Sequence, residues 1–168
     1  MHISRKKLLL MILSFEEVTD SISNGLFRKE RYFLTLVDIN KEYIVSPFTY
    51  TRGFIKEKNA LEIIDDSICT SLDKVPLTQL GMRLKLHFEN NGKVENLSDS
   101  YKGAFIKLVL DKNEDAINLK GLLMKVIRSY NKTNIKHKDS IDLGIMLDFS
   151  SDKIISTPPP PLPIIIED

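Results

Sequence analysis

Residues 141–149 read IDLGIMLDF, the most regular two-residue alternation of apolar side chains in the chain. Successive side chains of a strand point to opposite faces of a sheet, so this period predicts a strand with one buried face. Residues 82–88, MRLKLHF, alternate in the same way and predict a second half-buried strand. Strands with one polar face are typical of antiparallel sheets.

Further strands are predicted from composition. Residues 32–39 and 42–45 are rich in aromatic and β-branched side chains and predict a hairpin, while 104–110 and the apolar run 8–13 predict two more strands, the second opening the domain. Asn90-Asn91-Gly92 supplies residues that tolerate a positive φ, so it predicts a tight turn with 93–97 returning alongside 82–88.

Two segments show the spacing of amphipathic helices. Residues 56–69 carry apolar side chains at helical intervals, and a second helix is predicted to begin near Asn113 as its N-cap. The apolar stripe of the second helix consists of Ala116, Leu119, Leu123, Val126, Ile127 and Tyr130.

These elements predict an α+β fold. A chain of 168 residues suits one domain, which we expect to cover residues 1–150 with a mainly antiparallel sheet and two principal amphipathic helices. Residues 151–168 form a separate unit, an extended arm rich in proline and isoleucine at the C-terminal end of the sequence.

One stretch of the second helix and the loop after it is basic. No acidic residue occurs between Asp115 and Asp139, although the chain as a whole has a net charge of +1. The cations are Lys120, Lys125, Arg128, Lys132, Lys136 and Lys138. They predict a patch that contacts an anionic membrane surface or a nucleic-acid backbone, or else a solvated helix face whose counterions are acids elsewhere in the fold.

A second group of charges lies on the predicted strands. Arg83, Lys85 and His87 share the polar face of one strand, and Asp142 and Asp148 share that of another. The two rows form cross-strand ion pairs if the strands are neighbours, or they are simply solvated, or the basic row binds phosphate.

The arm carries the most specific motif. Its core is Pro158, Pro159, Pro160, Pro161, Leu162, Pro163, Ile164, Ile165 and Ile166. Proline fixes φ and removes the N–H donor, so the run predicts a polyproline II segment, and PPLP resembles the ligands of some WW domains. The arm is then a partner ligand, a stiff spacer or a strap on its own domain, while the three isoleucines suit a strap or a strand added to another subunit's sheet.

Motifs of catalysis and cofactor binding are missing from the sequence. The three histidines lie far apart without metal-ligand spacing, and no phosphate-binding glycine loop, nucleophile elbow or kinase signature occurs. We therefore expect no metal, no cofactor and no enzymatic activity, although a dispersed active site is a third hypothesis. One cysteine, Cys69, predicts a reducing, intracellular location, either cytoplasmic or virion-associated.

A compact α+β domain with a basic patch and a proline-rich arm resembles the general plan of small matrix proteins of negative-strand RNA viruses. That resemblance implies a structural protein that binds membrane and nucleocapsid. Our leading hypothesis is a non-enzymatic interaction or assembly protein, homo-oligomeric, whose arm contacts a protein partner or a second copy. The alternative is a nucleic-acid-binding protein that acts through electrostatic contacts with the backbone.

Overall fold

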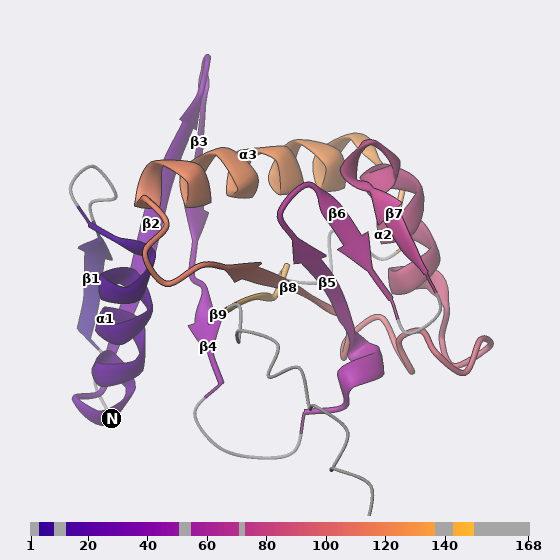
Figure 1. The fold of residues 1–168 in the computed structure, drawn as a ribbon, viewed down its shortest axis with the longest axis horizontal. Coiled ribbons are helices and arrows are strands. Elements are labelled where there is room, and N and C mark those ends of the chain that lie inside the picture. Colours follow the sequence, from indigo (N-terminus) through magenta and orange to yellow (C-terminus); the bar gives the residue numbers. More distant parts are fainter. Residues whose placement is uncertain (1–3, 9–12, 51–54, 71–72, 137–142, 150–168) are drawn as a thin grey trace, which may run out of the picture.

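The computed structural model describes residues 4–8, 13–50, 55–70, 73–136 and 143–149 (Figure 1). Within these residues the chain forms three α-helices and two β-sheets, so the predicted α+β class is confirmed. The predicted arm, the domain boundary at residue 150 and Lys138 lie outside the described residues.

The first sheet contains β1 (Ser4–Leu8), β2 (Glu30–Asp38) and β3 (Lys41–Val45) in that order. The β2–β3 pair is the predicted antiparallel hairpin. β1 is parallel to β2, because helix α1 (Phe15–Phe27) intervenes between them. Of the strand predicted at 8–13, residues 9–12 lie outside the described part, and β1 precedes most of that run.

Helix α1 was not predicted, although the sequence carries its start signal. The Ser14 backbone N–H donates to Glu17 Oε2 at 2.8 Å, and the Glu17 N–H donates to Ser14 Oγ at 3.3 Å. This reciprocal pair is a capping box, which satisfies two N–H groups at a helix start. Its Phe15 and Val18 are fully buried, in the same core as Leu34 and Leu36 of β2.

The second sheet has the order β4 (Phe48–Thr49), β9 (Ile145–Phe149), β8 (Phe105–Leu110), β5 (Ala60–Ile64), β6 (Ser67–Cys69) and β7 (Lys74–Pro76). The first four strands are mutually parallel, and only β6 and β7 join antiparallel. The prediction of a mainly antiparallel sheet is therefore wrong, and both sheets are mixed. Helices α2 (Leu80–Glu89) and α3 (Ala116–Lys132) return the chain before β8 and β9, so these strands run parallel.

The helix predicted over residues 56–69 is wrong. This segment forms a short 3-10 turn, η1 (Glu57–Asn59), followed by the β5–β6 hairpin, in which Asp65 has a φ of 54°. Leu61 and Ile63 are buried on one face, and β5 lies between two other strands. A strand that carries apolar residues on both faces does not show the two-residue alternation. The pattern of apolar residues that remains in this segment resembles the spacing of a helix.

The strand predicted over residues 82–88 is also wrong, because these residues belong to α2, which follows the short η2 (Leu77–Gln79). Met82 and Leu86 are 54% and 49% exposed, so the alternating apolar set does not share one buried face. The buried residues Leu80, Leu84, His87 and Phe88 are instead spaced four, three and one apart, as on a helix. Asn91 and Gly92 do adopt positive φ, but they follow the helix, and residues 93–97 form no strand.

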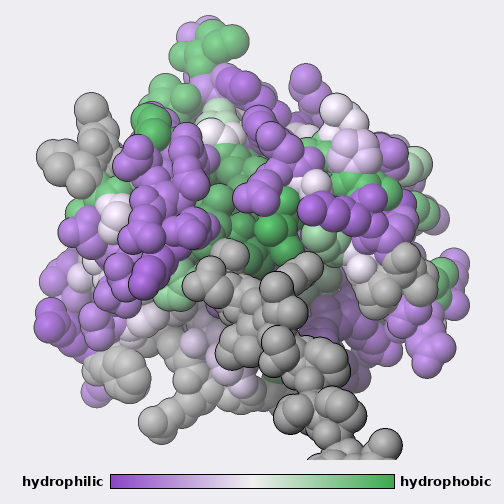
Figure 2. Space-filling model, in the orientation of Figure 1, coloured by the Kyte–Doolittle hydropathy of each residue, from purple (hydrophilic) through white to green (hydrophobic). Residues whose placement is uncertain are grey.

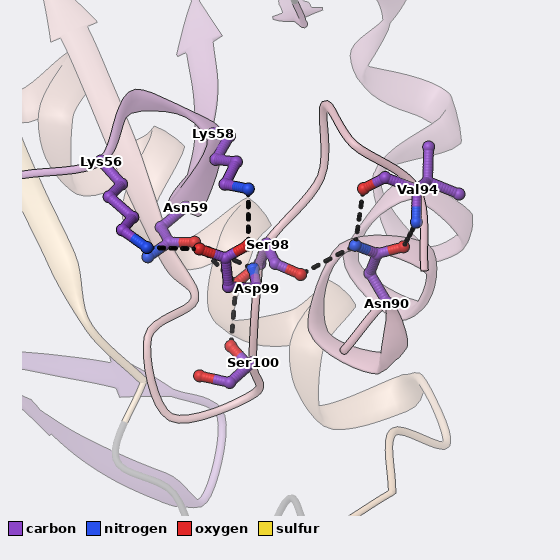
Figure 3. A network of polar contacts seen from close by, with 8 residues as sticks. All are labelled: Lys56, Lys58, Asn59, Asn90, Val94, Ser98, Asp99 and Ser100. Atoms are coloured by element: carbon purple, nitrogen blue, oxygen red, sulfur yellow. Dashed lines mark hydrogen bonds and ion pairs between the residues drawn. The ribbon is translucent and has the colours of Figure 1, made fainter. Parts of the chain in front are cut away.

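The loop after α2 is held by buried amides (Figure 3). Asn90 donates from Nδ2 to the carbonyls of Val94 and Ser98 at 2.9 and 2.8 Å and accepts the Val94 N–H at 2.8 Å. At the other end, Asn59 Oδ1 accepts the Asp99 N–H at 3.0 Å. The loop is therefore anchored both to α2 and to the turn that precedes β5.

Helix α3 confirms the second predicted helix and runs across the top of the six-stranded sheet in Figure 1. All six residues of its predicted apolar stripe are buried, but the N-cap is Asp115 rather than Asn113. The last predicted strand is confirmed as β9, in the shorter range 145–149. It lies between β4 and β8, and Met146 is buried as well as Ile145 and Leu147, as expected of an interior strand.

Candidate functional site

Two cations of α3 form ion pairs with acidic side chains of the fold. Arg128 donates from Nε and Nη2 to the two carboxylate oxygens of Asp38 in β2, at 2.8 and 2.6 Å. Lys125 Nζ lies 3.1 Å from Asp66 Oδ1, in the β5–β6 turn. Two predicted patch residues therefore have acidic partners from distant parts of the chain, whereas Lys132 and Lys136 are exposed and Lys120 is half-buried.

Three cations, Arg128, Lys132 and Lys41, lie around the Asp38 carboxylate. The hydrogen bond from Arg128 holds the pKa of the Asp38 carboxyl below its usual range, and the charges of Lys132 and Lys41 lower it further. Neither lysine forms an ion pair with a described acid. Three cations around Asp38, with the exposed Glu42 carboxylate next to Lys41, leave a small surplus of positive charge where the β2–β3 hairpin meets the end of α3.

The tip of this hairpin exposes aliphatic side chains. Val37 is 64% exposed, Ile39 91% and Ile44 70%. The hairpin projects beyond α3 in Figure 1, and Figure 2 shows hydrophobic side chains at its tip. We call Val37, Ile39 and Ile44, together with Lys41, Arg128 and Lys132, the hairpin surface; Val37 and Ile44 lie on one face of the hairpin, and Lys41, the register partner of Asp38, lies on the other.

The turn residue Ile39 has a backbone conformation that is unusual for its residue type. Its φ is 49°, in the left-handed region, which β-branched side chains rarely occupy. Glycine or asparagine would fit this turn position without strain. Because the side chain also buries almost nothing, Ile39 contributes no stability that would explain its presence. Such an outlier points to a role outside folding.

A row of cations continues along the outer face of the same sheet. Arg5 is the register partner of Arg31, and Lys7 is the partner of Phe33. Side chains alternate along β2, so Arg31 shares a face with Val37 and points away from Leu34, which is buried against α1. We call Arg5, Lys7 and Arg31 the cation row. All three are exposed and form no ion pair with a described acid, although like charges directly opposite each other are unfavourable.

The predicted cross-strand pairing of the second group of charges is wrong. Arg83 Nη2 binds Asp73 Oδ2 at 2.5 Å, and Asp148 pairs with Lys107 at 3.0 Å, so the two rows do not meet. His87 is only 1% exposed, and its Nε2 lies 2.9 Å from the Asn59 carbonyl. Burial lowers the pKa of the His87 imidazole, so the Nε2–H of the neutral ring donates to that carbonyl. Asp142 lies outside the described residues.

A groove of about 790 Å³ opens on the six-stranded sheet, beside Lys107. Lys107 Nζ lies 2.9 Å from Glu62 Oε1 and 3.0 Å from Asp148 Oδ2. Burial lowers the pKa of Lys107, but hydrogen bonds to Glu62 and Asp148 raise it by more, so the net pKa is raised and the amine stays charged. The part of the chain that the structure describes contains no group of three side chains able to hold a metal ion.

No protein-family model matches the chain, and no curated protein and no solved structure matches it either. Among the described helices, none has the length and the apolar content needed to cross a bilayer. Function is therefore inferred from geometry alone.

Sequence reasoning placed Arg128 and Lys132 at the site but missed its aliphatic part and the cation row. One signal was available. Ile39 directly precedes Asn40-Lys41, at a position where a tight turn normally carries a small or polar residue. The pairing of Arg5 with Arg31 had no such signal, because it depends on the parallel register of β1 with β2.

Proposed function

We propose that this protein is a non-enzymatic interaction and assembly protein that docks on an anionic membrane surface through the hairpin surface and the cation row. The observation that carries the proposal is Ile39, a strained β-branched residue that is 91% exposed beside Lys41 and Lys132. The protein contact predicted for residues 158–166 lies outside the described residues and stays a prediction.

The magnitudes suit reversible binding to a membrane. Each lysine or arginine near an anionic lipid surface contributes about 1 kcal/mol, and burying an isoleucine side chain contributes about 1.5 to 3 kcal/mol. The aliphatic tip and the flanking cations therefore act together, whereas neither alone gives stable anchoring. The three cations of the cation row lie on the face that also presents Val37 and Ile44.

The aliphatic tip favours a lipid surface over a nucleic acid. Cations bind phosphate in both, but sheets that bind single strands present aromatic side chains on which bases stack. The outer face of β2 offers one aromatic residue, Phe33, and it is half-buried. Val37, Ile39 and Ile44 would gain nothing from a phosphate backbone, whereas they fit the boundary between headgroups and acyl chains.

Vesicle sedimentation tests the proposal. The full chain should sediment with phosphatidylcholine vesicles that contain phosphatidylserine and stay in solution with phosphatidylcholine alone. Replacing the two lysines of the hairpin surface that form no ion pair with a described acid, K41E/K132E, should abolish sedimentation. The matched control K74E/K93E changes two exposed lysines elsewhere and should retain it.

Two outcomes would overturn the proposal. One is equal sedimentation of the two variants. The other is no vesicle binding together with duplex DNA binding that falls steeply with salt, which would favour the nucleic-acid alternative.

A further inference from the structure

The groove on the six-stranded sheet lies on the face opposite the main core. Leu61, Ile63, Ile106 and Leu108 are buried in the core that they share with Leu119 and Leu123 of α3. The alternate residues point the other way, and their register aligns Glu62 with Lys107 and Lys107 with Met146. The groove of about 790 Å³ follows this second face from Asp148 of β9 across to Cys69 of β6.

The groove is a trough whose lining mixes polar and charged residues, among them Glu57, Lys58, Thr70 and Asn96, with apolar ones. Lys107 is held between Glu62 and Asp148, so its charge is already balanced. The remaining lining includes Tyr50, Phe105 and Met146, and Phe105 packs on Phe48 with ring centroids 5.8 Å apart. The aromatic and aliphatic part of this lining offers contacts to a ligand that brings few N–H donors of its own.

One wall of the groove is rigidly built. Asn96 and Leu97 line it, and they lie in the loop that Asn90 holds (Figure 3). Lys56 and Lys58 bracket Asp99 at 2.9 and 2.5 Å and fix the far end of that loop. A preformed wall lowers the entropic cost of binding an extended segment.

We propose that residues 158–166 of this chain dock in the groove as an intramolecular strap. A polyproline II segment is already extended, carries no N–H on its prolines, and binds grooves lined by aromatic side chains. Leu162 and the three isoleucines that follow the prolines supply apolar side chains for the trough. This inference is independent of the membrane proposal, because the groove and the hairpin surface share no residue.

The chain's path favours this occupant over a second copy. Asp148 lines the groove and belongs to β9, the last described strand, so the arm leaves the fold beside the groove. β6 is three strands away from β9, a distance of about 14 Å at about 4.8 Å per strand. Eight extended residues after Ser150 span about 25 Å, which is enough to reach every part of the trough. Tethering also gives the arm an effective concentration in the millimolar range.

Cys69 gives a direct test, since it is the one cysteine of the chain and lines the groove. A maleimide-benzophenone on Cys69 of the full chain, photolysed and mapped by mass spectrometry, should form adducts on residues 158–166 within the monomer. A mixture of isotopically light and heavy chains identifies adducts between copies. Adducts between copies, or adducts confined to other segments, would overturn the intramolecular strap.

Thiol kinetics give a second readout. In the unlabelled full chain, I164D/I165D/I166D should accelerate the reaction of Cys69 with a disulfide reagent at least fivefold, because acidic side chains cannot stay in the trough. The control K85E/K93E changes two exposed lysines outside the groove lining and should react at the parent rate. Equal rates in the parent and the isoleucine variant would contradict the proposal, provided that circular dichroism shows both proteins folded.

Discussion

Replacing Ile39 by asparagine should stabilise the fold and weaken membrane binding at once. Ile39 has a φ of 49° and is 91% exposed, so the side chain has no packing to lose. A left-handed conformation costs an ordinary L-residue about 1 to 2 kcal/mol, and asparagine tolerates it far better. I39N should therefore raise the free energy of unfolding by about 1 kcal/mol, or the melting temperature by about 2 to 4 °C for a chain of this size.

Binding should change in the opposite direction. Withdrawing an isoleucine side chain from the lipid interface loses about 1.5 to 3 kcal/mol, which is a tenfold to hundredfold loss in partition coefficient. Urea unfolding measures the first effect, and titration with phosphatidylserine-containing vesicles measures the second. A residue that helps binding and harms folding is the signature of a functional position.

The matched control is D65G. Asp65 also has a positive φ, of 54°, in the exposed β5–β6 turn. This substitution should relieve a smaller strain, because aspartate tolerates the left-handed region better than isoleucine does, and it should leave vesicle binding unchanged. Unchanged vesicle binding by I39N, or equal losses in both variants, would refute the reasoning.

Three further predictions test single groups. D38N removes the carboxylate that Arg128, Lys132 and Lys41 surround, so it should tighten binding to anionic vesicles severalfold; weaker binding in a vesicle titration would contradict this. N90A should lower the urea-derived stability by about 2 to 3 kcal/mol, because it deletes three hydrogen bonds of a buried amide, whereas the exposed control N96A should change it little. Burial holds the pKa of His87 below the ordinary histidine value of about 6.5, so stability should be full above about pH 6.5 and fall at lower pH, where only the unfolded chain takes up the proton; urea unfolding of H87Q should lack this component of the pH dependence.

The sequence predicted the elements whose signals are local and undisturbed. The 32–45 hairpin, β8 and α3 were predicted because their composition and periodicity agree with their burial. The alternation at 82–88 failed because Met82 and Leu86 are exposed on a helix, while Leu80 and Leu84 supply its buried contacts. Tertiary burial, which the sequence pattern does not reveal, decided between the two periods.

The sheet topology had a different obstacle. β5 was read as part of a helix and α2 as a strand, so the crossovers that make β5, β8 and β9 parallel were hidden. Because a helix was predicted in place of β5 and a strand in place of α2, the predicted order of elements implied hairpins and an antiparallel sheet. Each error was local, but together they reversed the direction of pairing.

The candidate site could be predicted only in part. Arg128 and Lys132 were singled out, but the carboxylate they share, Asp38, lies 90 positions away from Arg128. Val37 and Ile44 are exposed because the register places them on the face of the β2–β3 hairpin opposite the buried Leu34 and Leu36. Contacts between distant segments and the shape of the surface are not present in local patterns.

The most direct measurement places a fluorophore at the hairpin tip. An environment-sensitive nitrobenzoxadiazole on I39C, in a C69S background, should shift to the blue and brighten with phosphatidylserine-containing vesicles but not with phosphatidylcholine alone. The same label on V94C, a position that is 47% exposed on the loop after α2, should not respond. An unchanged spectrum at residue 39, or an equal shift at residue 94, would contradict docking through the hairpin surface.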